Sequence, residues 1–151
     1  MNNSVRLLTI LLPVLILVGC GPSAEEIKEQ EKQATLAQWT SAVNSLEELK
    51  GYENTKEIFA GVEMYITSDG KGVVFRETQY SYSFFGGAGL RWLHREFGIP
   101  DYIIERISNT APTDGNQKDS YDNVEINWSI EIRDYARFSV KETYIDLRVV
   151  D

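Results

Sequence analysis

A strict alternation of apolar and polar residues near the C-terminal end constrains this chain more than any other feature. The apolar positions are Val124, Ile126, Trp128, Ile130 and Ile132, and a polar residue stands between each pair of them. Successive side chains of a strand point to opposite faces of its sheet, so this segment predicts a strand with one buried face. That buried face needs a second layer to cover it.

Helical periodicity in the N-terminal third predicts a helix that can cover the buried face of the sheet. Ser23 and Glu26 have the capping-box spacing, which predicts a helix over 24–50 with Gly51 as its left-handed C-terminal cap. Its first turns carry only Ile27 as a large apolar residue and resemble a solvated stalk. An apolar stripe then recurs at spacings of three and four: Leu36, Trp39, Val43, Leu46 and Leu49. We expect this stripe to pack on the rest of the domain, although a short coiled-coil seam is the alternative.

The middle of the chain predicts a hairpin and then short helices. Alternation over 61–85 indicates the hairpin, with a bulge between Arg76 and Gln79 because the apolar positions change face there. Short helices are expected within 88–110, the first ending at Gly98. Residues 101–110 fit either a helix or a strand, and Pro100 with Asp101 at the start favours a helix.

The C-terminal part predicts an exposed loop over 111–123 and a second hairpin over 124–150, with a tight turn at 134–135. Phe138 and Val140 are expected to face the core, and a second bulge is expected near Glu142. We therefore predict one α+β domain over 24–151. In this fold, a long N-terminal helix and one or two short helices pack on one face of an antiparallel sheet of about four strands.

Composition excludes several classes of function. The chain has 151 residues, a net charge of −8, one cysteine and one histidine. A strongly acidic domain repels the phosphate backbone, so nucleic acid is not an expected partner. A lone cysteine cannot build a disulfide framework, and with one histidine it leaves too few ligands for a structural zinc site.

The N-terminus has the pattern of a secretory signal. An apolar run over 7–18 is too short to span a bilayer as a helix. It ends in Leu17-Val18-Gly19-Cys20, which resembles a bacterial lipobox. The resemblance implies a signal peptide over 1–19, cleavage between Gly19 and Cys20, and diacylglycerol, with or without an N-acyl chain, on Cys20. The alternative is an ordinary secretory peptide with a chance cysteine.

This resemblance implies a cellular address. Residues 20–23 would form a lipidated tether, and the domain would lie outside the cytoplasm on the cell membrane or outer membrane. No other cofactor is expected. In an envelope with two membranes, Gly21 in place of Asp favours the outer one, but the sequence leaves the number of membranes and the oligomeric state open.

A second resemblance covers 97–130. Its motifs are Phe97-Gly98-Ile99-Pro100-Asp101, Ile103-Ile104, Thr110, Asp114-Gly115-Asn116-Gln117 and Trp128-Ser129. This pattern is similar to that of small secreted or lipid-anchored bacterial proteins that have no assigned activity. A looser likeness, a helix followed by Gly-x-Pro, resembles the accessory lipoproteins of outer-membrane assembly. Both resemblances imply binding rather than catalysis.

No catalytic or metal site is predicted from the remaining residues. His94 is the only histidine and fits a solvated position on a short helix. The glycines of 86–89 could cradle an anion on backbone amides, but the spacing fits a strand-to-helix turn better. Asp114, Asp119 and Asp122 lack EF-hand spacing, so a solvated acidic loop is favoured over a calcium site.

Surface aromatic residues are the remaining candidates for function. Tyr65, Tyr80 and Tyr82 lie on or near the first hairpin, where exposed rings would serve as interface anchors. The alternative is that they cover the sheet under the long helix. We therefore expect a membrane-anchored envelope protein that binds a protein partner non-covalently, as an accessory or scaffold subunit. The alternative function is a module that binds a small ligand or inhibits an enzyme.

Overall fold

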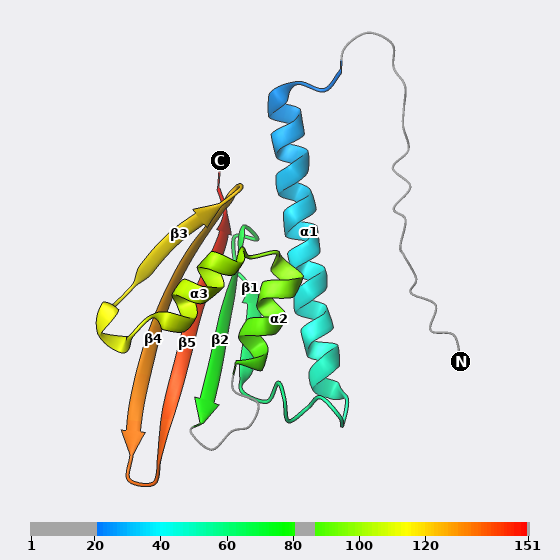
Figure 1. Cartoon of the computed structure of the whole chain (residues 1–151). Helices are drawn as coiled ribbons and strands as arrows, with labels where there is room; N and C mark the ends of the chain where they lie inside the picture. The colour runs from blue at the N-terminus through cyan, green and yellow to red at the C-terminus, as the bar shows by residue number, and fades with distance from the viewer. Residues whose placement is uncertain (1–20, 81–86, 151) are drawn as a thin grey trace.

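The computed structural model describes residues 21–80 and 87–150, and it has helices packed on a five-stranded antiparallel sheet (Figure 1). The strands are β1 Val62–Ile66, β2 Gly72–Tyr80, β3 Gln117–Tyr121, β4 Val124–Tyr135 and β5 Phe138–Val149. Their order in the sheet is β1-β2-β5-β4-β3. The predicted α+β class is confirmed, with five strands rather than about four.

The helices provide the second layer. They are α1 Ala24–Gly51, α2 Ala88–Phe97, α3 Asp101–Asn109 and the short 3-10 helix η1 Pro112–Asp114. The segment after Pro100 is therefore a helix, as favoured by its sequence, and α2 ends at Gly98 in the left-handed conformation. No helix in the described ranges is both long and apolar enough to cross a membrane.

The start of α1 follows its sequence pattern closely. The Ser23 hydroxyl accepts from the Glu26 N–H at 3.2 Å, and the Ser23 N–H donates to the Glu26 carboxylate at 2.6 Å. These reciprocal bonds satisfy donors that the first turn leaves unpaired. Residues 21–31 are exposed, and the helix first buries a side chain at Trp39. The N-terminal part of α1 is thus a solvated stalk.

The predicted left-handed cap at Gly51 is wrong. Gly51 is the last residue of α1, and Tyr52 follows it in an extended conformation with φ −86°. The Tyr52 N–H bonds to the Leu49 carbonyl at 3.3 Å, and the Thr55 hydroxyl donates to the same carbonyl. Because these donors satisfy the end of the helix, no residue with positive φ is needed.

One hydrophobic cluster joins the helices to one face of the sheet. Trp39 and Leu46 of the α1 stripe are buried in it, and Leu36, Val43 and Leu49 pack against it. The remaining buried members come from every layer: Phe75, Leu93, Ile103, Ile107, Ile126, Trp128, Ile145 and Leu147 are among them. The predicted docking of the stripe on its own domain is confirmed.

β2 and β5 contain neither of the predicted bulges. They pair in one uniform register, from Gly72 opposite Arg148 to Tyr80 opposite Val140. Along these regular strands, the apolar side chains move from the helix-covered face to the open face, and the backbone makes no bulge. Near the far end of the strands, Glu77 and Thr143 lie on the helix-covered face, whereas Tyr80, Phe138 and Val140 lie on the open face. The prediction that Phe138 and Val140 face the core is therefore wrong, because the expected bulge near Glu142 is missing.

The predicted loop over 111–123 contains a strand, which is the fifth strand of the sheet. Residues 117–121 form β3, pairing with β4 from Gln117 opposite Trp128 to Tyr121 opposite Val124. Its residues are polar because it is a short strand at the edge of the sheet, and pairing with β4 overrides its weak strand propensity. Asp122, with φ 48°, makes the turn between the two strands.

The turn of the last hairpin lies two residues later than predicted. Asp134 and Tyr135 remain in β4, and the turn residues are Ala136 and Arg137, between the paired Tyr135 and Phe138. The rings of this closing pair stack with centroids 5.0 Å apart. This cross-strand aromatic contact favours continuing the strands up to the ring pair.

Candidate functional site

The open face of the sheet carries an aromatic cluster at the end opposite to the start of α1 (Figure 1). We define this cluster as Tyr80, Tyr135 and Phe138. Phe138 lies 6.1 Å from Tyr80 and 5.0 Å from Tyr135 between ring centroids. Tyr80 is 41% exposed and Tyr135 is 52% exposed. Exposed rings held by one another present apolar area to a partner with little loss of side-chain entropy.

The structure places two of the three predicted tyrosines on this open face but far apart. Tyr65 pairs with Val74 in β1 and is 56% exposed. Tyr80 lies six residues beyond Val74 on β2, which corresponds to about 20 Å along the strand. Tyr65 therefore does not belong to the aromatic cluster, and Tyr82 lies outside the described residues. The alternative that these rings lie under the helices is wrong for Tyr65 and Tyr80.

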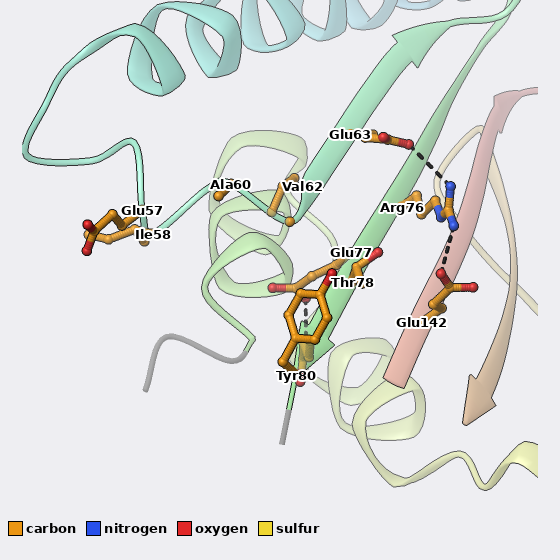
Figure 2. Close-up of a pocket in the computed structure, with 12 residues that line it drawn as sticks. Glu57, Ile58, Ala60, Val62, Glu63, Arg76, Glu77, Thr78, Tyr80 and Glu142 are labelled. Carbon is orange, nitrogen blue, oxygen red and sulfur yellow. Dashed lines mark hydrogen bonds and ion pairs between the residues drawn. The ribbon is translucent and has the colours of Figure 1, made fainter. Parts of the chain in front are cut away.

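Beside the cluster, a buried carboxylate organises two arginines. Glu142 is 5% exposed and accepts from Arg76 at 2.7 Å and from the Tyr144 hydroxyl at 2.8 Å. Arg133 lies 3.3 Å from the same carboxylate, and Arg76 also reaches Glu63 at 3.5 Å. Figure 2 shows Arg76 between Glu63 and Glu142. These bonds fix the arginines on the open face.

The network perturbs the acidity of its members. The hydrogen bond from Tyr144, followed by that from Arg76, holds the pKa of Glu142 below its ordinary value. The same bond to Glu142 raises the pKa of Tyr144. Both shifts favour a charged Glu142 beside a neutral Tyr144 at neutral pH.

A cavity of about 490 Å³ lies next to this network, between the segment before β1 and the end of β2 (Figure 2). Among the described residues, its charged lining is mostly acidic: Glu57, Glu63, Glu77 and Glu142 are acids, and Arg76 is the only cation. Such a lining suits a small ligand that carries positive charge.

Glu77 is the residue that sequence reasoning missed. It is 3% exposed on the helix-covered face, and its carboxylate accepts from the Gly89 N–H at 2.9 Å and from Gln79 at 3.1 Å. The N-cap residue Gly87 has no side chain to cap α2, so Glu77 does so from the neighbouring sheet. The sequence signal for its burial is that Glu77 continues the alternate positions of Val73 and Phe75, which face the core.

This contact also bears on the glycines of 86–89, of which Gly86 lies outside the described residues. The Gly89 amide, which could have held an external anion, is bonded to the chain's own Glu77. A Cβ at Gly89 would lie 2.6 Å from Val62 Cγ2 and 3.1 Å from the Glu77 carboxylate. The glycine therefore allows α2 to approach the sheet closely.

The other polar candidates do not converge on a catalytic arrangement. His94 is partly exposed and lies 3.3 Å from Asp101 at the α2–α3 junction. Asp119 pairs with Arg106, while Asp114 accepts from the Ala111 N–H at 2.7 Å. Within residues 21–80 and 87–150, no group of three or more His, Cys, Asp or Glu side chains could hold a metal ion.

Several residues of the 97–130 motifs meet in the fold and brace α3 against the sheet. The Trp128 indole N–H donates to the Thr110 hydroxyl at 2.8 Å, and Arg106 lies 5.3 Å from the centre of the Trp128 ring. Gln117 donates to the Asp114 carbonyl at 2.7 Å. These contacts give the motif residues a structural role.

The predicted lipidation site, Gly19 and Cys20, lies outside the described residues. Comparison of the chain with protein-family models, curated proteins and solved structures finds no match.

Proposed function

We propose that this protein is anchored to the bacterial envelope by lipid on Cys20 and binds another envelope protein as an accessory or scaffold subunit. The observation that carries the proposal is the exposed aromatic cluster of Tyr80, Tyr135 and Phe138. It lies at the end of the sheet farthest from the start of α1. Neighbouring Arg133 adds a second residue type common at interfaces.

The form of α1 supports this orientation. The helix begins at Ala24, only a few residues after Cys20, and residues 21–31 are exposed. Ten helical residues span about 15 Å, so a lipid on Cys20 would hold the sheet away from the bilayer. The aromatic cluster would then face away from the membrane, where a partner domain can reach it.

In-cell crosslinking tests the partner. A photoreactive phenylalanine replaces Tyr80 or Tyr135, and the same replacement at Tyr65 is the matched control, because Tyr65 is exposed on the same face but distant. We expect the first two positions to capture one reproducible envelope protein and Tyr65 to capture none. Capture of lipid alone, or of nothing, from a folded protein at every position would contradict the proposal.

Metabolic labelling tests the anchor separately. Cys20→Ala removes the thiol that would carry the diacylglycerol, so palmitate incorporation should be lost and the precursor should accumulate or be released. Cys20→Ser is the matched conservative control, because it keeps the size of the side chain and also lacks the thiol. Labelling of either variant at the wild-type level would disprove lipidation at this position.

The cavity beside Arg76 favours a second candidate function, the binding of a small cationic ligand. Glu57 and Glu63 line its rim and can be changed without altering the core. Spermidine is a suitable probe for calorimetric titration. Saturable binding that Glu57→Gln weakens and Tyr135→Ala does not would support this function over partner binding.

A further inference from the structure

A second cavity lies on the open face of the sheet, which is the face turned away from α2 and α3 in Figure 1. We call it the open-face cavity, and its volume is about 310 Å³. The side chains that line it are Asn116, Asn127, Ser129, Tyr144, Asp146 and the apolar Val74. The strand registers bring them together, because Val74 pairs with Asp146 and Asp146 pairs with Asn127. Ser129 and Tyr144 pair in the next row of the same face.

Several polar groups of the open-face cavity have no partner within the described chain. The Oδ1 atom of Asp146 is buried and accepts no hydrogen bond from any described residue. The side chains of Asn116 and Ser129 form no hydrogen bond with the parts of the chain that the structure describes. The Asn127 amide donates to Glu125 at 3.1 Å, which leaves its carbonyl oxygen as an acceptor. A buried acceptor without a donor costs free energy, so a ligand that supplies donors here is stabilised.

The charges around the open-face cavity exclude two classes of ligand. Asp146 is the only charged side chain among the described residues that line it. Arg148 lies 3.6 Å from the Asp146 carboxylate and also pairs with Asp69, so an anionic ligand would meet no spare cation in a chain of net charge −8. A calcium ion needs several oxygen ligands that are mostly charged, and this lining has a single carboxylate. The class that fits is an uncharged ligand with both donors and acceptors.

The apolar part of the site lies at one end of a row of side chains. Tyr65 of β1 pairs with Val74, and its side chain is 56% exposed on the same face. The row that crosses four adjacent strands is Tyr65, Val74, Asp146 and Asn127. Neighbouring strands lie about 4.8 Å apart, so the row is about 14 Å long. An elongated ligand would therefore meet an aromatic ring and methyl groups at one end and polar acceptors at the other.

We propose that the open-face cavity binds an uncharged oligosaccharide that carries N-acetyl groups. An acetamido group has an N–H donor for Asp146, a carbonyl acceptor for the Asn116 amide and a methyl group for Val74. Sugar hydroxyls both donate and accept, as the Ser129 hydroxyl does, and the apolar face of a sugar ring can pack on the Tyr65 ring. Val74 lies about 20 Å from Tyr80 along β2, so this site is separate from the aromatic cluster and does not rest on the proposed protein partner.

Chemical-shift mapping by NMR tests the site on the unmodified protein. The probe is triacetylchitotriose, an uncharged trisaccharide with an acetamido group on every ring. It is titrated into the isotope-labelled full chain in a polyoxyethylene detergent, which has no sugar headgroup. Maltotriose is the matched control, because it has hydroxyls but no acetamido groups. We expect saturable shifts at the backbone amides of Val74, Asn127 and Asp146, and binding of maltotriose should be at least about 10-fold weaker.

Substitutions in the cavity test the roles of its side chains. Ser129→Ala removes a hydroxyl that has no bond within the described chain, so the fold should be retained and binding should weaken about 3-fold. Asp146→Ala removes the buried acceptor and should weaken binding at least about 10-fold. Asp101→Ala is the matched control, because Asp101 is an exposed aspartate in the helix layer and binding should not change. Circular dichroism establishes that each variant keeps the wild-type fold.

Several results would overturn the proposal. These are the absence of saturable shifts with triacetylchitotriose, equal binding of maltotriose, and equal effects of Asp146→Ala and Asp101→Ala. Shifts centred on Tyr80 and Tyr135 would place the sugar on the aromatic cluster and would also overturn this site. If Asp146→Ala does not fold, the wild-type shifts and Ser129→Ala still decide. Crosslinking from Tyr80 and Tyr135 reports on the protein partner alone, so a failure of either proposal leaves the other intact.

Discussion

Removing the carboxylate of Glu77 should destabilise the whole domain, because this side chain ties α2 to the sheet. In Glu77→Ala the buried Gly89 N–H loses its acceptor, which costs about 1–3 kcal/mol. Loss of the negative charge at the N-terminus of α2 adds about 0.3–1 kcal/mol. The expected decrease in the free energy of unfolding is thus about 3 kcal/mol. Glu77→Gln keeps an acceptor oxygen, so it should cost only about 1 kcal/mol.

Urea unfolding followed by tryptophan fluorescence measures this difference. With a slope of about 2 kcal/mol per molar urea, the midpoint of Glu77→Ala should fall by about 1.5 M. Glu63→Ala is the matched control, because Glu63 is an exposed glutamate on the neighbouring strand and its ion pair with Arg76 is solvated. A midpoint for Glu77→Ala within about 0.2 M of the wild type would refute the capping role.

Two further predictions concern packing and pH. Gly89→Ala should destabilise the protein by about 1–3 kcal/mol, because its Cβ would lie 2.6 Å from the buried Val62 side chain; a melting temperature equal to wild type would contradict the close approach. The lowered pKa of Glu142 means that this residue stabilises the fold above its ordinary pKa of 4.5 and that the contribution is lost as pH falls through the lower folded value. The stability gap between wild type and Glu142→Gln should therefore narrow below about pH 4.5, and a constant gap in urea unfolding down to about pH 3 would exclude this role.

Much of the candidate surface could not be predicted from local pattern. Tyr80 was identified from the sequence, but Tyr135 was assigned to a turn, and Phe138 was assigned to the core. The two errors have different causes. The turn lies later than predicted because Tyr135 pairs and stacks with Phe138, and Phe138 lies on the open face because β5 continues in one register without a bulge. No helix within residues 21–80 and 87–150 covers Ile132, so apolar residues are exposed on both faces of the hairpin.

The sequence by itself determined the elements whose signals are local. Strand and helix geometry set the spacing of side chains within a few residues, so such patterns can be read locally. Examples are the alternation from Val124 to Ile130, the capping box at Ser23 and the apolar stripe from Leu36 to Leu49. These features are enough to specify an open-faced sheet covered by a long helix, which is the observed α+β class.

Tertiary structure alone decided the features that depend on distant partners. β3 is a strand because β4 pairs with it, and Glu77 can be buried because the Gly89 N–H, in the helix layer, donates to its carboxylate. The second half of β4 is an edge because β3 begins only at Gln117, opposite Trp128. Such features depend on where other segments end and on which buried donors need acceptors, and neither is encoded in a short stretch of sequence.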